Sequence, residues 1–286
     1  MAEGRALTLY EEVHGKKTAI KRKTHENFLQ RLKTLLPEGC QPVLVTDAGF
    51  KTPWFRAVEA LGWYWVARVR NPCYVRLAGE ETWQPVKMLY ARAGARATYL
   101  GKVELIRSRG HGCHLVLYQA KAQGRRVINR YGNHSRSQRS MKAARGAREP
   151  WVLASNLPSG FKFAHKVVQL YRRRMQIEES FRDIKSARFG LALEFHRSRD
   201  PKRLAILLLI ATLALLVLWL IGRVAREQGL ARQYQANTVR QREVLSIIFL
   251  GMRVIERAQK HFTVAEICSA WQPAVRLNVE TWGDVP

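Results

Sequence analysis

The sequence predicts a mixed α/β protein with a β-rich segment in its middle and a helical C-terminal region. Three observations lead to this prediction. A strand, a helix and a second strand follow one another within residues 42–70, helical periodicity disappears from 71 to about 148, and long helical patterns resume after 164. With 286 residues and 47% hydrophobic content, the chain can build one large or two ordinary domains.

The first 70 residues predict a β-α-β unit that is preceded by one more strand and helix. Residues 6–13 have the composition of a strand, and the apolar spacing of residues 24–36 indicates a helix. The next apolar run ends in Asp47 and a turn, so a carboxylate stands at the carboxyl end of a buried strand, where ligands gather in open α/β sheets. A helix at 52–61 and a strand at 63–70 complete the unit.

The β-rich segment predicts strands at 98–106 and 113–119. Its last part, residues 121–148, carries nine Lys or Arg residues and no acid, which predicts a mobile basic loop that is solvated or contacts DNA. Beyond this loop, the pattern predicts a strand at 151–154 and helices at 164–186 and 237–258.

The charge balance indicates a polyanionic partner. Lys and Arg outnumber Asp and Glu by 49 to 22, which gives a net charge of +27 and a pI near 10.7. Nucleic acid is the leading candidate, although charge alone also fits a ribosome-like or merely basic soluble protein.

Cysteine usage and the N-terminus predict a cytoplasmic protein. The four cysteines form no C-x-x-C pair, and the first residues lack the apolar stretch of a signal peptide. His111, Cys113 and His114 are the nearest approach to a metal cluster, but no fourth ligand stands at a sensible spacing, so we do not expect a zinc site.

Residues 204–221 form an apolar run of eighteen residues that only Thr212 interrupts, long enough for a membrane-spanning helix. Basic residues flank the run on both sides and give no orientation. A helix that is apolar all round can equally be the central helix of a large soluble core. We favour the core helix and expect no membrane partner, and the membrane anchor stays as an alternative.

Four residues at the spacing Y-x2-R-x3-E-x6-K form the most specific signal in the chain. On one continuous helix, Tyr171, Arg174, Glu178 and Lys185 occupy an arc about 60° wide, so one carboxylate shares a face with three phosphate-contacting side chains. An apolar arc lies beside it and would place Glu178 at the margin of a core, while Glu179 lies about 100° further round. The members of that apolar arc are Leu170, Ile177, Phe181 and Ile184.

This four-residue pattern resembles the Y-R-E-K signature of the insertion-sequence-four family of bacterial DDE transposases. Further stretches are similar to that family, and they are spread over most of the chain. They are Val45-Thr-Asp-Ala-Gly-Phe-Lys-Thr-Pro-Trp-Phe, Leu61-Gly-Trp-Tyr-Trp-Val-Ala-Arg-Val-Arg, Glu149-Pro-Trp-Val-Leu-Ala-Ser-Asn-Leu-Pro and Gln235-Ala-Asn-Thr-Val-Arg.

The resemblance implies an RNase H-like sheet in which two Asp and one Glu bind divalent metal, Mg²⁺ or Mn²⁺, with a β-strand domain inserted before the Glu. Asp47 matches the second Asp and Glu178 matches the Glu. Carboxylate oxygens suit these metals, and a two-metal site can carry out in-line displacement at phosphorus.

Other matched positions imply contacts with double-stranded DNA. Tyr171, Arg174 and Lys185 match residues that contact phosphates near the transposon end, and Trp151 matches, within one position, a tryptophan used when a base is flipped out. A buried aromatic residue of a strand is an equally good interpretation of Trp151. The family also implies a homodimer in the complex with DNA.

The resemblance divides the chain into parts. They are the first part of the RNase H-like core at 1–70, the β-rich insertion at 71–148, the second part of the core at 149–225 and a helical region at 226–286.

One departure from the family pattern concerns the first catalytic Asp. In the family it precedes a segment similar to Arg5-Ala-Leu-Thr-Leu-Tyr-Glu, and this chain begins at that segment, so the first strand and its Asp are missing from an incomplete sheet. Asp183 and Glu179 point away from the arc of Glu178 on the predicted helix and are poor substitutes. We therefore expect a truncated transposase with weak or no cleavage activity alone. The alternatives are an inactive fragment that binds DNA or dimerises and, less favoured, a basic membrane-anchored protein.

Overall fold

The computed structural model describes residues 5–121, 133, 137–187, 190–239, 241–257 and 261–280. The chain divides into two compact units. Residues Ile20–Arg174 form the first, here called the sheet unit, and residues Met1–Ala19 together with Met175–Pro286 form the second, here called the helical unit.

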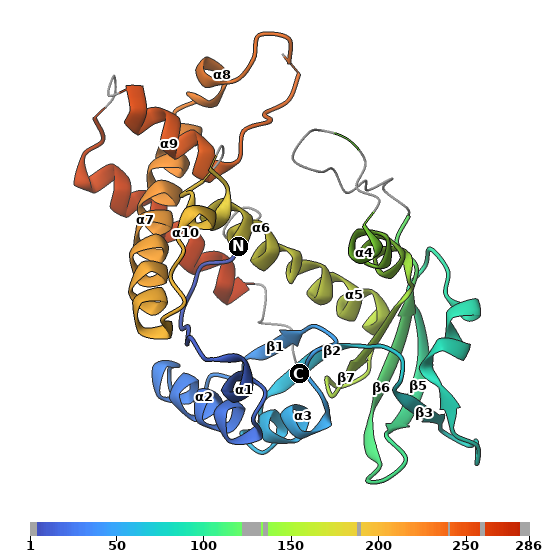
Figure 1. The fold of residues 1–286 in the computed structure, drawn as a ribbon. Helices are drawn as coiled ribbons and strands as arrows, with labels where there is room; N and C mark the ends of the chain where they lie inside the picture. The colour runs from blue at the N-terminus through green and yellow to red at the C-terminus, as the bar shows by residue number, and fades with distance from the viewer. Residues whose placement is uncertain are drawn as a thin grey trace. The chain divides into compact units, whose positions relative to one another are not determined.

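The sheet unit is built on one mixed seven-stranded sheet with the order β1-β2-β7-β6-β5-β3-β4 (Figure 1). Strands β1 and β2 are parallel, and the other strand pairs among the described residues are antiparallel. The strands are β1 Val43–Thr46, β2 Tyr64–Val69, β3 Tyr74–Leu77, β4 Gln84–Pro85, β5 Thr98–Leu105, β6 His111–Tyr118 and β7 Trp151–Ser155. The strands expected at 63–70, 98–106, 113–119 and 151–154 are therefore confirmed.

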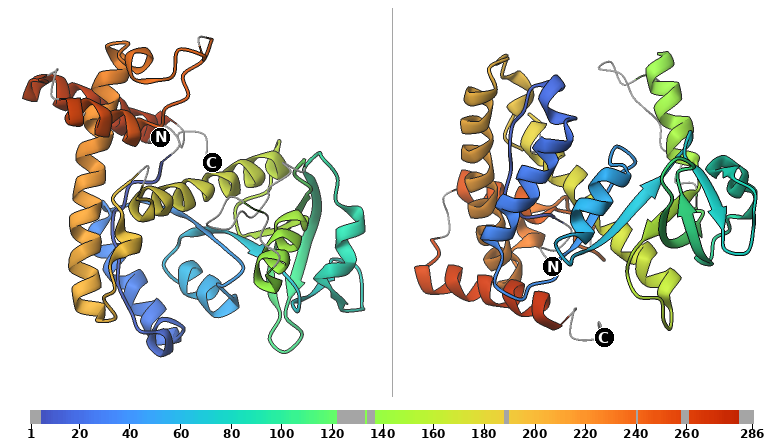
Figure 2. Two further views of the ribbon diagram at one scale, coloured as in Figure 1. Left: turned by 45° about the horizontal axis from the view of Figure 1, so that its top comes forward. Right: turned by 90° about the horizontal axis from the view of Figure 1, so that it is seen from below.

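Helices cover both faces of this sheet (Figure 2). Helices α2 (Arg22–Leu35) and α3 (Thr52–Glu59) lie over one face, where Phe55 stacks on Trp65 with ring centroids 4.2 Å apart. Helix α5 (Phe163–Arg173) lies over the other face and contacts β1, β2, β5, β6 and β7. Strand alternation explains the division, because odd-numbered β2 residues enter the core under α3 and even-numbered residues face α5.

The β-rich segment continues the sheet rather than standing apart from it. Strand β6 pairs with β7 from Tyr118 opposite Trp151 to His114 opposite Ser155, and β5 and β3 follow outward. Alternation along β6 also separates the three residues considered for zinc. His111 and Cys113 face the core with Trp65, whereas His114 packs on Phe163 of α5.

Two irregular segments were predicted incorrectly. Residues 138–148, expected within a basic loop, form helix α4 (Gln138–Arg148), because Ser137 caps its first turn by accepting from the Ser140 amide at 3.2 Å and good helix formers follow. Residues 122–132 of that expected loop lie outside the described residues. Residues 6–13 form no strand.

The N-terminal segment is instead fastened to helix α6 (Met175–Lys185) within the helical unit. Arg5 Nε lies 2.5 Å from Asp183 Oδ2, and the Ala6 amide donates to Ser180 Oγ at 3.1 Å. Both side chains of the ion pair are nearly buried. These contacts satisfy the polar groups that a strand would otherwise pair.

The helix expected at 164–186 is divided into α5 and α6 at Arg174. The Arg174 amide bonds to the Tyr171 carbonyl three residues back, at 3.1 Å, which tightens and ends the turn. The division also separates the two units. Ile177 and Phe181, expected in a buried arc, are 40% and 49% exposed.

The helical unit also contains α7 (Pro201–Glu227), α9 (Ile247–Arg257) and α10 (Val264–Glu280), with short helices α1 (Lys16–Ala19) and α8 (Ala231–Tyr234) (Figure 1). Helix α9 is shorter than the helix expected at 237–258. The reason lies in Gln235, whose amide donates to Val239 O at 2.6 Å and Arg242 O at 3.1 Å and so holds the preceding residues in a loop.

Helix α7 was predicted to be a central core helix, and this prediction is wrong for its N-terminal half. Its apolar window has a mean hydropathy of 3.1 and is only 22% buried among the described residues. Leu218 and Trp219 are buried, but Ile206, Ile210 and Leu213 are more than half exposed. By length and composition alone, α7 is also a candidate membrane span.

Helices α7 and α9 cross at two glycines, which gives a prediction for stability. A Cβ on Gly251 would lie 2.1 Å from the Leu218 carbonyl oxygen, and one on Gly222 would lie 1.9 Å from the Ile247 carbonyl oxygen. Gly251→Ala should therefore push the two backbones apart and lower the free energy of unfolding by about 2 kcal/mol or more, measured by urea unfolding.

Gly146→Ala in α4 is the matched control. A Cβ there meets only the end of the flexible Arg70 side chain at 3.0 Å, so stability should stay the same or rise with helix propensity. Equal stability of Gly251→Ala and the wild type would contradict the close crossing.

Candidate active site and nucleic-acid interface

Asp47 is held at the carboxyl end of β1, as expected from the sequence. Its side chain is exposed, and Oδ1 accepts a hydrogen bond from the Gly49 amide at 2.8 Å. A Cβ on Gly49 would lie 2.9 Å from the same oxygen, so glycine permits this close turn. The turn thus fixes one carboxylate oxygen while the group stays open to solvent.

Trp151, Tyr171 and Arg174 are brought together at the C-terminal end of α5. The rings of Trp151 and Tyr171 meet edge to face with centroids 4.9 Å apart. The ring of Tyr118, on the neighbouring strand β6, has its centroid 5.6 Å from that of Trp151. The Arg174 guanidinium carbon is 5.8 Å from the Tyr171 ring centroid. Three of the residues expected to contact DNA therefore form one aromatic and basic cluster.

Two further arginines join this cluster, and sequence reasoning missed them. Arg172 donates to the Tyr118 hydroxyl, and Arg68 donates to the carbonyls of Glu149 and Pro150 at 3.3 and 3.4 Å. Burial lowers the pKa of Arg68 and its neighbour Arg70 lowers it further, while Tyr171 and Glu149 raise it. Such a guanidinium stays charged at neutral pH and adds positive potential beside Tyr171. Strand alternation was the signal that could have found Arg68, because it lies on the same face of β2 as Val66.

Glu149 is the acid in this region, and it is already paired. Arg70 donates to Glu149 Oε2 from Nε at 2.8 Å and from Nη2 at 2.5 Å. The pairing neutralises the carboxylate next to the aromatic cluster. The cluster therefore keeps an excess of positive charge that suits phosphate groups.

Glu178 and Lys185 lie on α6 in the helical unit. The Glu178 side chain is exposed, whereas Glu179 is partly buried and paired with Arg182. The angles on the predicted helix placed Glu178 at the margin of the core and Glu179 toward the solvent, so the structure reverses the expected exposure of the two acids. Lys185 Nζ lies 5.6 Å from the Phe181 ring centroid. The four residues of the Y-R-E-K pattern, which were expected on one helix, are thus divided between the two units. Tyr171 and Arg174 belong to the sheet unit, and Glu178 and Lys185 belong to the helical unit.

The donor chemistry of Asp47 and Glu178 suits Mg²⁺ or Mn²⁺, since both supply carboxylate oxygens. Within the described part of the chain, however, no three His, Cys, Asp or Glu side chains gather in a group that could hold a metal ion. Each of the two carboxylates therefore fits a divalent ion by ligand type.

The mixed sheet covered by helices, the carboxylate at a strand end and the basic aromatic cluster together define an α/β protein that handles nucleic acid. The family model of the transposase DDE domain matches residues 9–217. This match covers most of the chain, so the protein belongs to the transposase DDE domain family. No curated protein matches the chain. Membership implies a transposition enzyme that binds DNA and uses divalent metal ions.

The packing of Trp151 leads to a prediction that tests its role. Because its ring is packed against Tyr118 and Tyr171, Trp151→Ala should lower the free energy of unfolding by about 2 kcal/mol, and Trp151→Phe should lower it less. Urea unfolding measures both variants. Unchanged stability of Trp151→Ala would contradict the packing role of the ring.

Proposed function

We propose that this protein is a cut-and-paste DNA transposase of the insertion-sequence-four family, most similar to the transposase of insertion sequence ten. The observation that carries the proposal is the combination of Asp47 at a strand end with the pattern Tyr171, Arg174, Glu178 and Lys185, all inside the matched family region. The clustering of Tyr171 and Arg174 with Trp151 supports it.

In this proposal Asp47 and Glu178 are the carboxylates of a catalytic centre that takes Mg²⁺ or Mn²⁺. When bound, a pair of divalent ions activates the attacking hydroxyl and stabilises the leaving oxygen of a phosphodiester. The chain's own contribution is to hold the carboxylates and grip the DNA. The planar fork of Arg174 and the point charge of Lys185 suit phosphate oxygens near the transposon end.

We also propose the wider organisation that the family implies. The RNase H-like core comprises residues 1–70 and 149–225, the insertion comprises 71–148, and the helical region comprises 226–286. A homodimer would assemble on double-stranded DNA, in the cytoplasm next to the nucleoid. The exposed apolar residues of α7 indicate that this helix binds another surface rather than staying in contact with water.

A second candidate function is a transposase fragment that binds DNA without cleaving it. The observation that favours it is that the described residues bring no three metal-ligand side chains together. Two matched carboxylates would hold a metal pair weakly, whereas Arg174 and the rings of Trp151 and Tyr171 lie close together, which supports DNA binding. The two candidates differ in cleavage and agree in DNA binding.

A cleavage assay separates these candidates. The probe is duplex DNA from both flanks of the gene, incubated with Mg²⁺ or Mn²⁺ and the 286-residue protein. Weak cleavage that falls to background in both Asp47→Asn and Glu178→Gln is expected, because each change removes an anionic oxygen ligand. Glu179→Gln is the matched control and should keep the wild-type rate, since its carboxylate pairs with Arg182.

The other outcomes decide between the alternatives. Duplex binding in a gel shift with no cleavage by the wild type would favour the DNA-binding fragment. Robust cleavage that both variants abolish would reject that fragment, and cleavage that survives both changes would reject the assignment of Asp47 and Glu178.

A further inference from the structure

Phe161 is an exposed aromatic side chain in the loop between β7 and α5. Its side chain is 90% exposed, more than any other large hydrophobic side chain among the described residues. Exposing a phenyl ring to water is unfavourable, and this ring is not among the buried residues of the core. The exposure therefore calls for a partner that covers the ring.

The loop that carries Phe161 is anchored on both sides. Leu157 is buried, and its amide donates to Ser155 Oγ at 3.1 Å. Phe163 is buried against the rings of Tyr99 and His114, with centroids 5.0 and 5.3 Å away. The exposed ring thus projects from a fixed turn, which the Phe163 amide closes onto the Gly160 carbonyl at 3.1 Å.

The backbone of this turn includes an uncommon conformation. Lys162 has a φ of 56°, in the left-handed region that non-glycine residues adopt at some cost. That conformation places the Lys162 ammonium 4.9 Å from the centroid of the Phe161 ring. A cation covers part of one face of the ring, and the 90% exposure leaves the rest of the ring accessible.

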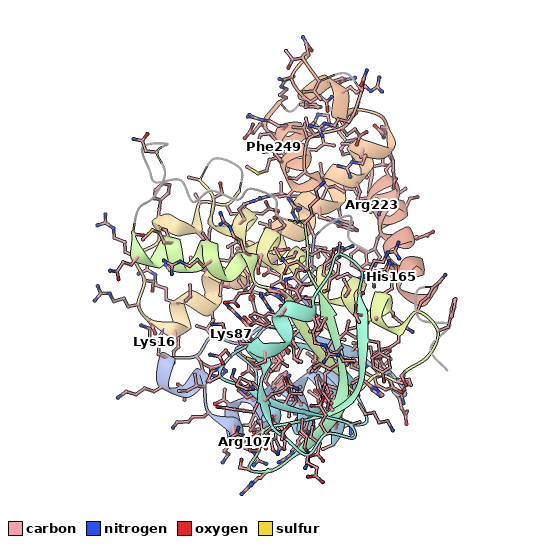
Figure 3. The ribbon with its side chains drawn as sticks, turned by 90° about the vertical axis from the view of Figure 1, so that its right-hand side faces the viewer. Lys16, Lys87, Arg107, His165, Arg223 and Phe249 are labelled. Atoms are coloured by element: carbon pink, nitrogen blue, oxygen red, sulfur yellow. The ribbon has the colours of Figure 1, made fainter. Side chains whose placement is uncertain are left out.

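The positive charge around Phe161 favours a polyanion as the partner that covers the ring. Between Pro150 and Ile177 the chain has five Lys or Arg residues and no Asp or Glu. His165, labelled in Figure 3, and Lys166 lie on the first turn of α5 next to the loop. An apolar protein partner would not need this one-sided charge, whereas DNA offers phosphates for the cations and base faces for the ring.

We propose that Phe161 stacks on a DNA base while Lys162 contacts the neighbouring phosphate. The proposal deepens the proposed function and rests on DNA binding by this chain. Because α5 rises about 1.5 Å per residue, its ends at Phe163 and Arg173 stand about 15 Å apart, or about four to five base steps along one strand.

The test uses a short mixed-sequence DNA duplex with 2-aminopurine at single positions, titrated with the wild type and with Phe161→Ala, Phe161→Trp and Phe195→Ala. Phe195, at 71% exposure, is an equally apolar aromatic control in the helical unit. Phe161→Ala should bind about tenfold more weakly with an unchanged salt slope, because stacking contributes to affinity without releasing counterions. Phe161→Trp and Phe195→Ala should bind as the wild type does.

Binding that is weakened in Phe161→Ala and restored in Phe161→Trp, together with a change in 2-aminopurine fluorescence that the wild type and Phe161→Trp produce and Phe161→Ala does not, would establish the stacking contact. Equal affinity and equal fluorescence for the wild type and Phe161→Ala would overturn it while DNA binding stands. Failure of the wild type to bind any duplex would overturn both the stacking contact and the proposed function.

Discussion

The sheet unit depends on the packing of helix α5 across five strands. Its buried side chains face β1, β2, β5, β6 and β7, and each contributes roughly 2 kcal/mol by burial. The same helix fixes Phe163 at one end and Tyr171 at the other, so the Phe161 loop and the Trp151 cluster are positioned by one packed element. A shift of α5 would move every proposed DNA contact of this unit together. The apolar face of α5 therefore supports the function as directly as the polar residues do. The members of that face are Phe163, Val167, Val168, Leu170 and Tyr171.

Local sequence patterns predicted strands β1, β2, β5, β6 and β7, the α3 helix and the position of Asp47, because alternation, turn residues and a first-turn proline act within a few residues. They could not predict features that depend on distant partners. Residues 6–13 are irregular because Arg5 and Ala6 bind Asp183 and Ser180, more than 170 positions away. The loop before α9 exists because the Gln235 side chain takes the backbone groups that a helix would use. No residue in the run 164–186 marks the division at Arg174, where the chain passes from the sheet unit to the helical unit.

The same holds for the candidate site: residues that local patterns mark could be predicted, and residues that depend on distant partners could not. Asp47 and Trp151 could be found because the first follows and the second begins a patterned strand, and Tyr171 because of its spacing to Arg174, Glu178 and Lys185. Arg68 and Arg172 escaped because an arginine in a basic chain carries little information until its partners are known. The pairing of Glu149 with Arg70 leaves the aromatic cluster positive, while the proposed ligands Asp47 and Glu178 stay exposed. Charge in this protein is thus organised by pairing as much as by composition.

The proposal on which the function depends is that Asp47 and Glu178 serve one metal centre. Iron-directed cleavage tests it without requiring transposition: the protein is loaded with Fe²⁺ in the presence of duplex DNA, treated with ascorbate and peroxide, and its fragments are mapped by mass spectrometry. Cuts close to residues 47 and 178 together, suppressed by excess Mg²⁺ and lost at both places in Asp47→Asn, are the expected result. Cuts at one of these positions alone, or at neither, would contradict a shared centre.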